Sequence, residues 1–443
     1  RTAESKRLFC ASESGALKWR MSEGVPSCTS SPRHDQAPWT FCARVLKGVE
    51  KSGNRITAVI FENGNRVEAK MFIDASYEGD LMAQAGVSFT IGREDNSKYG
   101  ETINGFYIPQ RNNFKSPLDP YRTPGDPKSG LLPGIQSGPL PEPGTGDKQV
   151  QAYGFRMCAS DAPDRRPFPK PGDFNRDTHL LLLRYLNSKS DSFWNFAYSR
   201  GPMKLNRGDC NNAGPMSIDY VGESRGWCEA DYATRERIFQ KHVTYQQGLM
   251  WVMANDPEVP ALVRKTVGKF GLTTEEFKET DGWPHELYVR EGRRMISDYV
   301  MTQADCSSQR VAPDSVGLGS YMMDSHFCSR IVAKGVVKAQ GGLGMKIPKP
   351  YPISYRSIVP RESECANLLV PVALSASHVA FSSIRMEPVF GILGQSAGTA
   401  AALAIDTGVP VQELDYARLR ERLLQDKQRL LWNGEVPAPT KEP

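Results

Sequence analysis

The stretch that decides the fold spans residues 367–408 and reads NLLVPVALSASHVAFSSIRMEPVFGILGQSAGTAAALAIDTG. It opens with an apolar run at 368–372, which predicts a short buried strand. The turn at 374–378 leads through SIRME at 383–387 into a helix expected to start at Pro388. Proline suits the first helical turn because the amide hydrogen that it lacks would have no partner there. This succession of strand, turn and helix favours an α/β fold.

The expected helix is rich in small residues, including Gly391, Gly394 and Gly398. Each glycine costs about 1 kcal/mol in a helix relative to alanine, so the three need a reason. Small residues let a backbone or a flat ligand approach closely, and a helix N-terminus offers unpaired N–H groups to an anion. Tight packing of the helix on a sheet would explain the same composition, so composition alone leaves both interpretations open.

A second informative stretch is FIDASYEGDLMAQAG at 72–86. Before it, the pattern predicts strands at 45–51, 56–61 and 66–70, with Asn63-Gly64 as a type I′ hairpin turn. A strand that opens into a glycine turn and a helix is where open α/β sheets bind ligands. An ordinary strand–turn–helix connection has the same pattern.

Size and composition exclude several classes of protein. A chain of 443 residues is long enough for two or three domains. Its 55 Lys and Arg against 50 Asp and Glu include no basic block, so a nucleic-acid partner is not expected. The sequence contains no run of 18 apolar residues, so no membrane-spanning helix is expected. The nine cysteines form no C-x-x-C pair and the six histidines are scattered, so neither a metal site nor an iron–sulfur cluster is expected.

The remaining segments differ in character. Residues 1–44 show no sustained apolar period and are expected to be irregular, and a first residue other than methionine is typical of a fragment or a processed chain. Prolines crowd 107–176, which favours a long loop, either an insertion or a lid. Apolar periodicity and capping residues then predict helices at 178–187, at 231–253 with Asp231 as its N-cap, at 258–270 and at 274–279, and a last helix capped by Asp415.

Several blocks together resemble a bacterial family of FAD-dependent oxidoreductases, the flavoproteins that are related to the heterodisulfide reductases. The resemblance covers about 45–431 and rests on six blocks: FIDASYEGDLMAQAG, QAYGFRMC (151–158), LNRGDCNNAGPMSIDYVG (205–222), WPHELYVREGRRMISDYVM (283–301), DSVGLGSYMMDSH (314–326) and SIRMEPVFGILGQSAGTAAALA. It implies a sheet domain of the FAD/NAD(P)-binding type, interrupted by a largely helical substrate or cap domain.

The implied sheet domain is discontinuous, at 45–105 and 356–410, and the implied cap domain is 106–355, followed by a C-terminal helix and tail at 411–443. Members of the family begin with a strand and a G-x-G-x-x-G turn that holds the cofactor's diphosphate. This sequence contains no such motif. The sheet domain is therefore expected to be incomplete at its N-terminus, and the chain to bind FAD weakly or not at all although its parent protein binds it.

The resemblance also implies where a cofactor would lie. Its expected contacts are Asp74, Ala75, Tyr77, Glu78, Gly79, Asp80, Ile384, Arg385, Met386, Glu387, Gly394 and Gly398. Arg385 and the start of the following helix are expected to stabilise negative charge on a reduced flavin. His378 and His326 are candidate general bases. A surface salt bridge for Arg385 and hydrogen-bonded structural roles for the histidines are the alternatives.

The function predicted from the resemblance is hydride transfer to flavin from a small organic substrate, with carbohydrate-derived compounds among the candidates. Three alternatives stay open: an electron-transfer protein of the heterodisulfide-reductase type, a carbohydrate lyase, and a remnant that keeps the fold without catalysis. A small-molecule substrate is the expected partner. The sequence determines neither the electron acceptor, the oligomeric state nor the compartment.

Overall fold

The computed structural model of the protein describes residues 9–10, 46–110, 112–188, 197–199, 207–212 and 214–434. Its strands are β1 (Phe9–Cys10), β2 (Leu46–Ser52), β3 (Arg55–Phe61), β4 (Arg66–Glu68), β5 (Phe72–Ile73), β6 (Phe89–Thr90), β7 (Ile135–Gln136), β8 (Cys158–Ser160), β9 (Ala197–Ser199), β10 (Arg207–Asn211), β11 (Gly271–Leu272), β12 (Arg294–Met295), β13 (Ser315–Gly319), β14 (Met323–Ser325), β15 (Ser329–Ala333), β16 (Val336–Gln340), β17 (Leu343–Met345), β18 (Tyr351–Ser354) and β19 (Leu368–Leu369).

The helices are α2 (Asp80–Gln84), α3 (Asn96–Tyr99), α4 (Leu180–Leu186), α5 (Tyr232–Asn255), α6 (Ala261–Val267), α7 (Gln303–Cys306), α8 (His378–Ile384), α9 (Glu387–Thr407) and α10 (Tyr416–Gln425). Short 3-10 helices lie at η1 (Pro127–Ser129), η2 (Arg176–His179), η4 (Lys278–Thr280), η5 (Tyr355–Ile358) and η6 (Val411–Glu413).

The two decisive stretches of sequence meet in one small sheet. In the sheet β1-β5-β19, β5 pairs in parallel with β19, so that Phe72 lies opposite Leu368 and Ile73 opposite Leu369. The predicted meander is present as β2-β3-β4. Parallel pairing places the ends of β5 and β19 at the same edge, so the turns that follow them lie at that edge.

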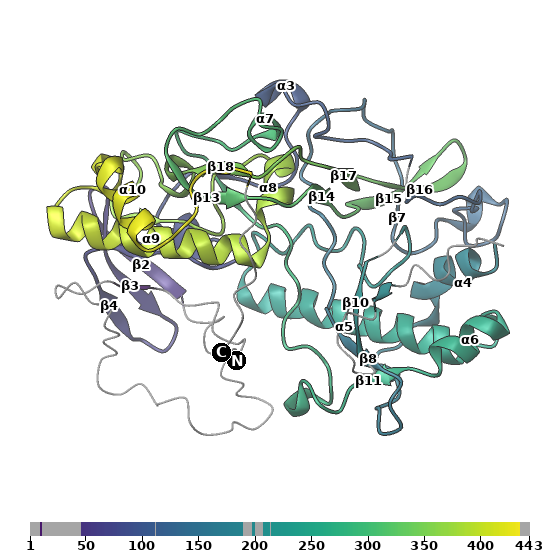
Figure 1. The fold of residues 1–443 in the computed structure, drawn as a ribbon. Coiled ribbons are helices and arrows are strands. Elements are labelled where there is room, and N and C mark those ends of the chain that lie inside the picture. The colour runs from purple at the N-terminus through teal and green to yellow at the C-terminus, as the bar shows by residue number, and fades with distance from the viewer. Residues whose placement is uncertain are drawn as a thin grey trace.

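The two sheets β1-β5-β19 and β2-β3-β4 belong to one lobe of the molecule, the sheet lobe. Helix α9 forms one side of this lobe and packs against β5, β13 and α10 (Figure 1). It begins at Glu387, one residue before the predicted start, with Pro388 in its first turn. Val389, Leu393 and Ala397 are buried, whereas Gly391, Gly394 and Gly398 would have nothing within 4 Å of an added Cβ.

Among the described residues, α9 alone is long and apolar enough to cross a membrane by length and composition, and 44% of its most apolar 18-residue window is buried.

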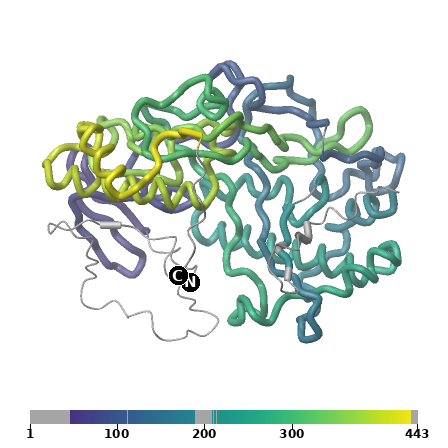
Figure 2. Tube along the Cα trace, viewed as in Figure 1, coloured from purple at the N-terminus to yellow at the C-terminus, as the bar shows by residue number. Residues whose placement is uncertain are grey.

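A second hydrophobic core occupies the other lobe, which is made mostly of residues from the predicted cap segment and is called the cap lobe. There α5 packs against α6 and η2, and β8 lies between β10 and β11. The Asp231 carboxylate caps α5, as predicted, by accepting the Thr234 N–H at 2.7 Å. Figure 2 shows the two lobes side by side: the first and last described parts of the chain gather in one, and the middle of the chain fills the other.

Three local expectations need correction. Within 1–44, Phe9–Cys10 is a strand antiparallel to β5, and the rest of that segment lies outside the described residues. At 63–64 only the glycine has a positive φ, so the turn is not type I′. Residues 274–279 form no α-helix, and η4 follows instead.

The predicted cap segment, 106–355, contains strands β7 to β18 as well as helices, so it is mixed and not largely helical. These strands are two to five residues long, too short for an alternating apolar pattern to reveal them, which explains the difference. Val316, Met323 and Tyr351 from this segment pack in the core of the sheet lobe. The domain boundaries themselves remain a prediction.

Candidate functional site

One extended segment, 288–294, connects the charged groups of the site. Tyr288 makes an isolated bridge with Gly154 of the cap lobe, and Arg294 pairs in β12 with Thr90. Neighbouring side chains of an extended backbone point in opposite directions. Arg290 and Glu291 accordingly reach different partners.

Arg290 belongs to a buried triad with Asp219 and His326. The His326 Nδ1 lies 2.6 Å from Asp219 Oδ2, and Arg290 Nη1 lies 3.1 Å from the other oxygen, Oδ1. Burial would raise the pKa of Asp219, but the charge of Arg290 and the hydrogen bond from His326 lower it overall. Burial, with the charge of Arg290, lowers the pKa of His326.

These shifts define the protonation of the pair. An ionised Asp219 is an acceptor only, so the neutral His326 donates its hydrogen from Nδ1. Its Nε2 is then an acceptor, and no hydrogen bond to Nε2 is found in the described part of the chain. A carboxylate that fixes the tautomer and later stabilises the imidazolium is how enzymes prepare histidine as a general base.

His378 belongs to a second, deeper network. Its Nδ1 lies 2.8 Å from Glu291 Oε2, and its backbone N–H donates to Glu94 Oε2 at 3.0 Å. Arg294 pairs with both Glu291 and Glu94. Burial opposes ionisation of Glu94, but the Arg294 charge and the hydrogen bonds lower its pKa to about 2.

Gln151 joins the two histidine networks. Its Oε1 accepts the backbone N–H of His326 at 3.3 Å, and its Nε2 donates to Glu291 Oε2 at 3.2 Å. The amide is fully buried, so both contacts are made without competing water.

Arg385 lies between α8 and α9 and is not a surface residue. Its Nη2 donates to the Asp324 carbonyl at 2.9 Å and lies 3.5 Å from the Asp324 carboxylate, while Nε is buried without a hydrogen-bond partner. Burial is the main cause that lowers the pKa of His326, and the charge of Arg385 adds a smaller lowering effect. The surface salt bridge considered for Arg385 is therefore wrong.

The predicted turn at 74–80 contacts the first turns of α9 through the side chain of Tyr77. The ring of Tyr77 contacts Phe390 edge-to-face, with centroids 5.8 Å apart. Burial first, and the charge of Glu387 second, raise the pKa of Tyr77. Burial likewise raises the pKa of Tyr288, assisted by Glu387 and opposed by Arg385.

The other polar residues of the turn are bonded within the protein. Asp74 accepts the Ser76 hydroxyl at 2.7 Å and the Met82 N–H at 2.9 Å. Glu78 accepts the Trp227 indole N–H at 3.2 Å.

Asp80 pairs with Arg235 at 2.5 Å and with Arg293 at 2.7 Å. Gly79 has φ +65°, and a Cβ there would lie 2.9 Å from Met82 Cε. These contacts give the turn its shape.

The residues expected to contact a cofactor divide into two groups. Tyr77, Arg385, Met386 and Glu387 lie at the N-terminus of α9, and Gly394 and Gly398 lie on its open face. Asp74, Glu78 and Asp80 have protein partners, Ile384 is fully buried, and Ala75 packs against the core.

Sequence reasoning missed Asp219, Arg290, Glu291, Gln151 and Tyr288. The available signal was REGRR at 290–294, which places four charged residues within five between apolar positions. Such density in a segment that must be partly buried requires ion-pair partners.

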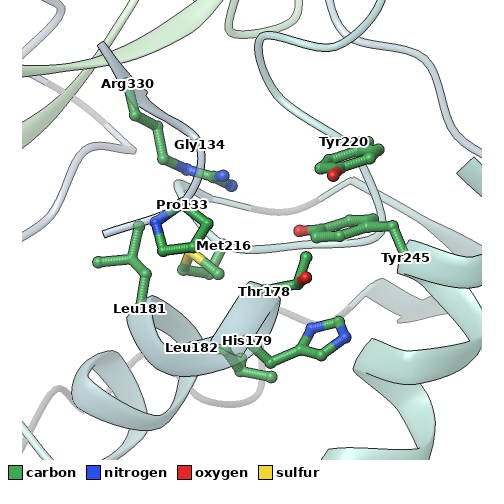
Figure 3. A pocket seen from close by; sticks show the side chains of 10 residues that line it. All are labelled: Pro133, Gly134, Thr178, His179, Leu181, Leu182, Met216, Tyr220, Tyr245 and Arg330. Atoms are coloured by element: carbon green, nitrogen blue, oxygen red, sulfur yellow. The ribbon is translucent and has the colours of Figure 1, made fainter. Parts of the chain in front are cut away.

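A small cavity lies elsewhere, in the cap lobe, between η2, α4, α5 and the 133–134 turn (Figure 3). Its volume of about 20 Å³ is enough for one water molecule and too small for a substrate. Tyr245 Oη and His179 Nδ1 border it and have no hydrogen-bond partner among the described groups. The cavity is consistent with a structural water.

Among the described residues, no group of three or more His, Cys, Asp or Glu is arranged to hold a metal ion.

Comparison with known proteins gives a match over most of the chain. A family profile described as FAD dependent oxidoreductase matches residues 36–423. No curated protein and no solved structure was found to match. The profile covers both decisive stretches and the 288–294 segment, and it indicates FAD binding and flavin redox chemistry. The chain belongs to the FAD dependent oxidoreductase family.

Proposed function

We propose that the protein oxidises a hydroxyl group of a small molecule, with His326 as the general base and FAD as the hydride acceptor. The observation that carries this proposal is the His326–Asp219 pair, whose Nε2 has no hydrogen-bond partner among the described residues and whose imidazole is near enough to Arg385, just before α9, for the two charges to interact. The heterodisulfide-reductase-like ancestry remains part of the proposal.

The residues at α9 fit the ring end of FAD. The N-terminus of α9 offers unpaired N–H groups to the electron-rich pyrimidine edge of the ring, and Arg385 beside it adds a positive charge. Gly394 and Gly398 leave the neighbouring helix face open to a flat ring. The sequence has no G-x-G-x-x-G for the diphosphate, so we propose that this chain binds FAD weakly.

When bound, FAD supplies a two-electron acceptor. In the proposed step, the substrate hydroxyl gives its proton to His326 Nε2 as the C–O single bond becomes a carbonyl. The hydrogen on the same carbon leaves with the electron pair of its C–H bond, as hydride. Asp219 stabilises the imidazolium that forms, and Arg385 balances the negative charge gained by the acceptor.

His378 suits a positioning role better than that of the base. It is almost fully buried, its Nδ1 is held by Glu291, and its backbone N–H is held by Glu94. Through Gln151 this network fixes the backbone at His326. We therefore assign proton transfer to His326 alone.

The test begins with the absorbance of the purified chain before and after excess FAD, followed by desalting. With FAD in excess, anaerobic mixing with alcohol and hydroxy-acid substrates should bleach the flavin band. His326→Asn should slow bleaching by about 10²- to 10⁴-fold, the usual contribution of a general base. Unchanged bleaching in this variant, with flavin still bound, would remove His326 from the mechanism.

A further inference from the structure

We propose that the substrate is an anion, a small hydroxy acid whose carboxylate binds the free edge of Arg290 together with Arg385. This inference deepens the proposed function and rests on it for the hydroxyl. The structure supplies three arguments: unpaired donors, their arrangement, and access.

Arg290 uses only one of its guanidinium nitrogens. Nη1 donates to the Ala152 carbonyl at 2.7 Å and pairs with Asp219 at 3.1 Å. Nε and Nη2 are buried and have no hydrogen-bond partner among the described residues. Buried N–H groups are rarely left unpaired in proteins, so a ligand or an ordered water is expected there.

The unpaired nitrogens form the edge that recognises carboxylates. Nε and Nη2 are parallel donors, and arginine binds a carboxylate through two such N–H···O bonds. Arg385 adds a third unpaired donor, Nε. The two guanidinium groups are close enough for the Arg385 charge to contribute to the lowered pKa of Arg290, of which burial is the main cause.

The arrangement also limits the distance between the hydroxyl and the carboxylate. His326 and Arg290 are bound to the two oxygens of the same Asp219 carboxylate. A ligand that reaches both His326 Nε2 and the Arg290 edge therefore needs its hydroxyl and carboxylate only a few bonds apart. Hydroxy acids, including sugar acids, meet this requirement.

Side-chain exposure increases toward Asp324, which favours entry of a ligand from that side. Side-chain exposure is 0% at Arg290, 10% at His326 and 30% at Asp324, the partner of Arg385. Tyr321 is 40% exposed, and Arg156, whose guanidinium lies 5.6 Å from the centroid of the Tyr288 ring, is also exposed. A ligand entering here would meet His326 before the more buried Arg385 and Arg290, so its carboxylate would lie deepest.

The experiment compares acids with neutral analogues on the protein in excess FAD. Calorimetry would measure binding of lactate against 1,2-propanediol and of gluconate against glucitol. Each pair differs in the replacement of a carboxylate by CH2OH. We expect at least one acid to bind 10-fold or more tightly than its neutral partner.

Arg290→Lys should abolish that preference, since lysine keeps the charge and lacks the two-pronged edge. If this variant does not fold, as judged by circular dichroism, Arg385→Lys should reduce the preference instead. Arg122→Lys, at an exposed pair with Asp177, is the matched control and should leave the preference intact.

The outcomes separate this inference from the proposed function. Equal binding of acid and neutral analogue, or binding of neither, would overturn the anion assignment and leave the unpaired donors to water. Oxidation of neutral alcohols alone would also overturn it while preserving the oxidase chemistry. Selective binding of acids without flavin bleaching would preserve the anion site and refute the proposed oxidation.

Discussion

Replacing Arg294 with methionine removes the cation on which the deeper network depends. Arg294 is fully buried and pairs with Glu94 at 2.6 Å and with Glu291. Its Nε also donates to the Ala376 carbonyl at 2.9 Å, and its Nη2 to the Gly92 carbonyl at 2.7 Å. Methionine fills a similar volume, so the substitution chiefly deletes charge and donors.

The expected cost can be worked out from these contacts. Breaking a buried ion pair by removing one partner costs about 3–5 kcal/mol. Independently, lowering the pKa of Glu94 from 4.5 to about 2 corresponds to about 3 kcal/mol at neutral pH, and Arg294 is the main cause that lowers it. With an unfolding entropy of about 2.1 cal/mol/K per residue, a chain of 443 residues loses about 1 °C per kcal/mol. A fall of about 3–5 °C at pH 7 is expected.

The measurement is thermal unfolding of wild type and Arg294→Met between pH 4 and pH 8. Because the pKa of Glu94 is depressed in the folded protein, its ionised form stabilises the fold above pH 4.5, and this stabilisation is lost as the pH falls toward 2. In the variant, burial without the cation should raise that pKa, so the deficit should shrink toward pH 4. Arg422→Met, at an exposed pair with Asp426, is the control. A deficit no larger than the control's, or one independent of pH, would refute the reasoning.

Gly394→Ala should raise the stability of the FAD-free protein by up to about 1 kcal/mol, because the added Cβ meets nothing within 4 Å, and should weaken FAD binding on that face. Gly79→Ala, at φ +65°, should instead lower stability by about 1–3 kcal/mol, and equal melting temperatures for the two variants would contradict both expectations. Burial lowers the pKa of His242 from 6.5 to about 4, so its neutral form contributes about 3 kcal/mol that is lost as pH falls through this range. His242→Gln should flatten the pH profile of stability between pH 6.5 and pH 4, and a profile parallel to that of wild type would show that His242 is not responsible.

Local patterns predicted the parts of the fold that local chemistry decides. The meander, the Asp231 cap and the glycine-rich helix follow from turn residues, capping and apolar period, and the structure confirms them. Most strand pairs within 106–355 were not predicted, because their strands are two to five residues long and several pairs join segments far apart in the sequence, as β13 and β18 do. Too few residues alternate in such strands to show a period.

The site was predictable only in part, for a related reason. Both histidines and Arg385 were identified, but the partners that decide their chemistry are far away in the sequence: Asp219 lies 107 residues from His326, and Glu291 lies 87 residues from His378. The roles of general base and cofactor contact remain predictions. The structure gives a basis for choosing between the two histidines, because each belongs to a different hydrogen-bond network.

Segment 288–294 ties folding to the construction of the site. Arg290, Glu291, Arg293 and Arg294 each make a buried or nearly buried ion pair, and their partners come from both lobes. Buried ion pairs stabilise proteins poorly, because desolvation offsets much of their attraction, and apolar residues of equal volume often serve stability as well. Their concentration in one short segment is therefore poorly explained by stability alone. It is better explained by orientation: the same segment fixes the tautomer of His326, the backbone that carries it, and the guanidinium edge beside it.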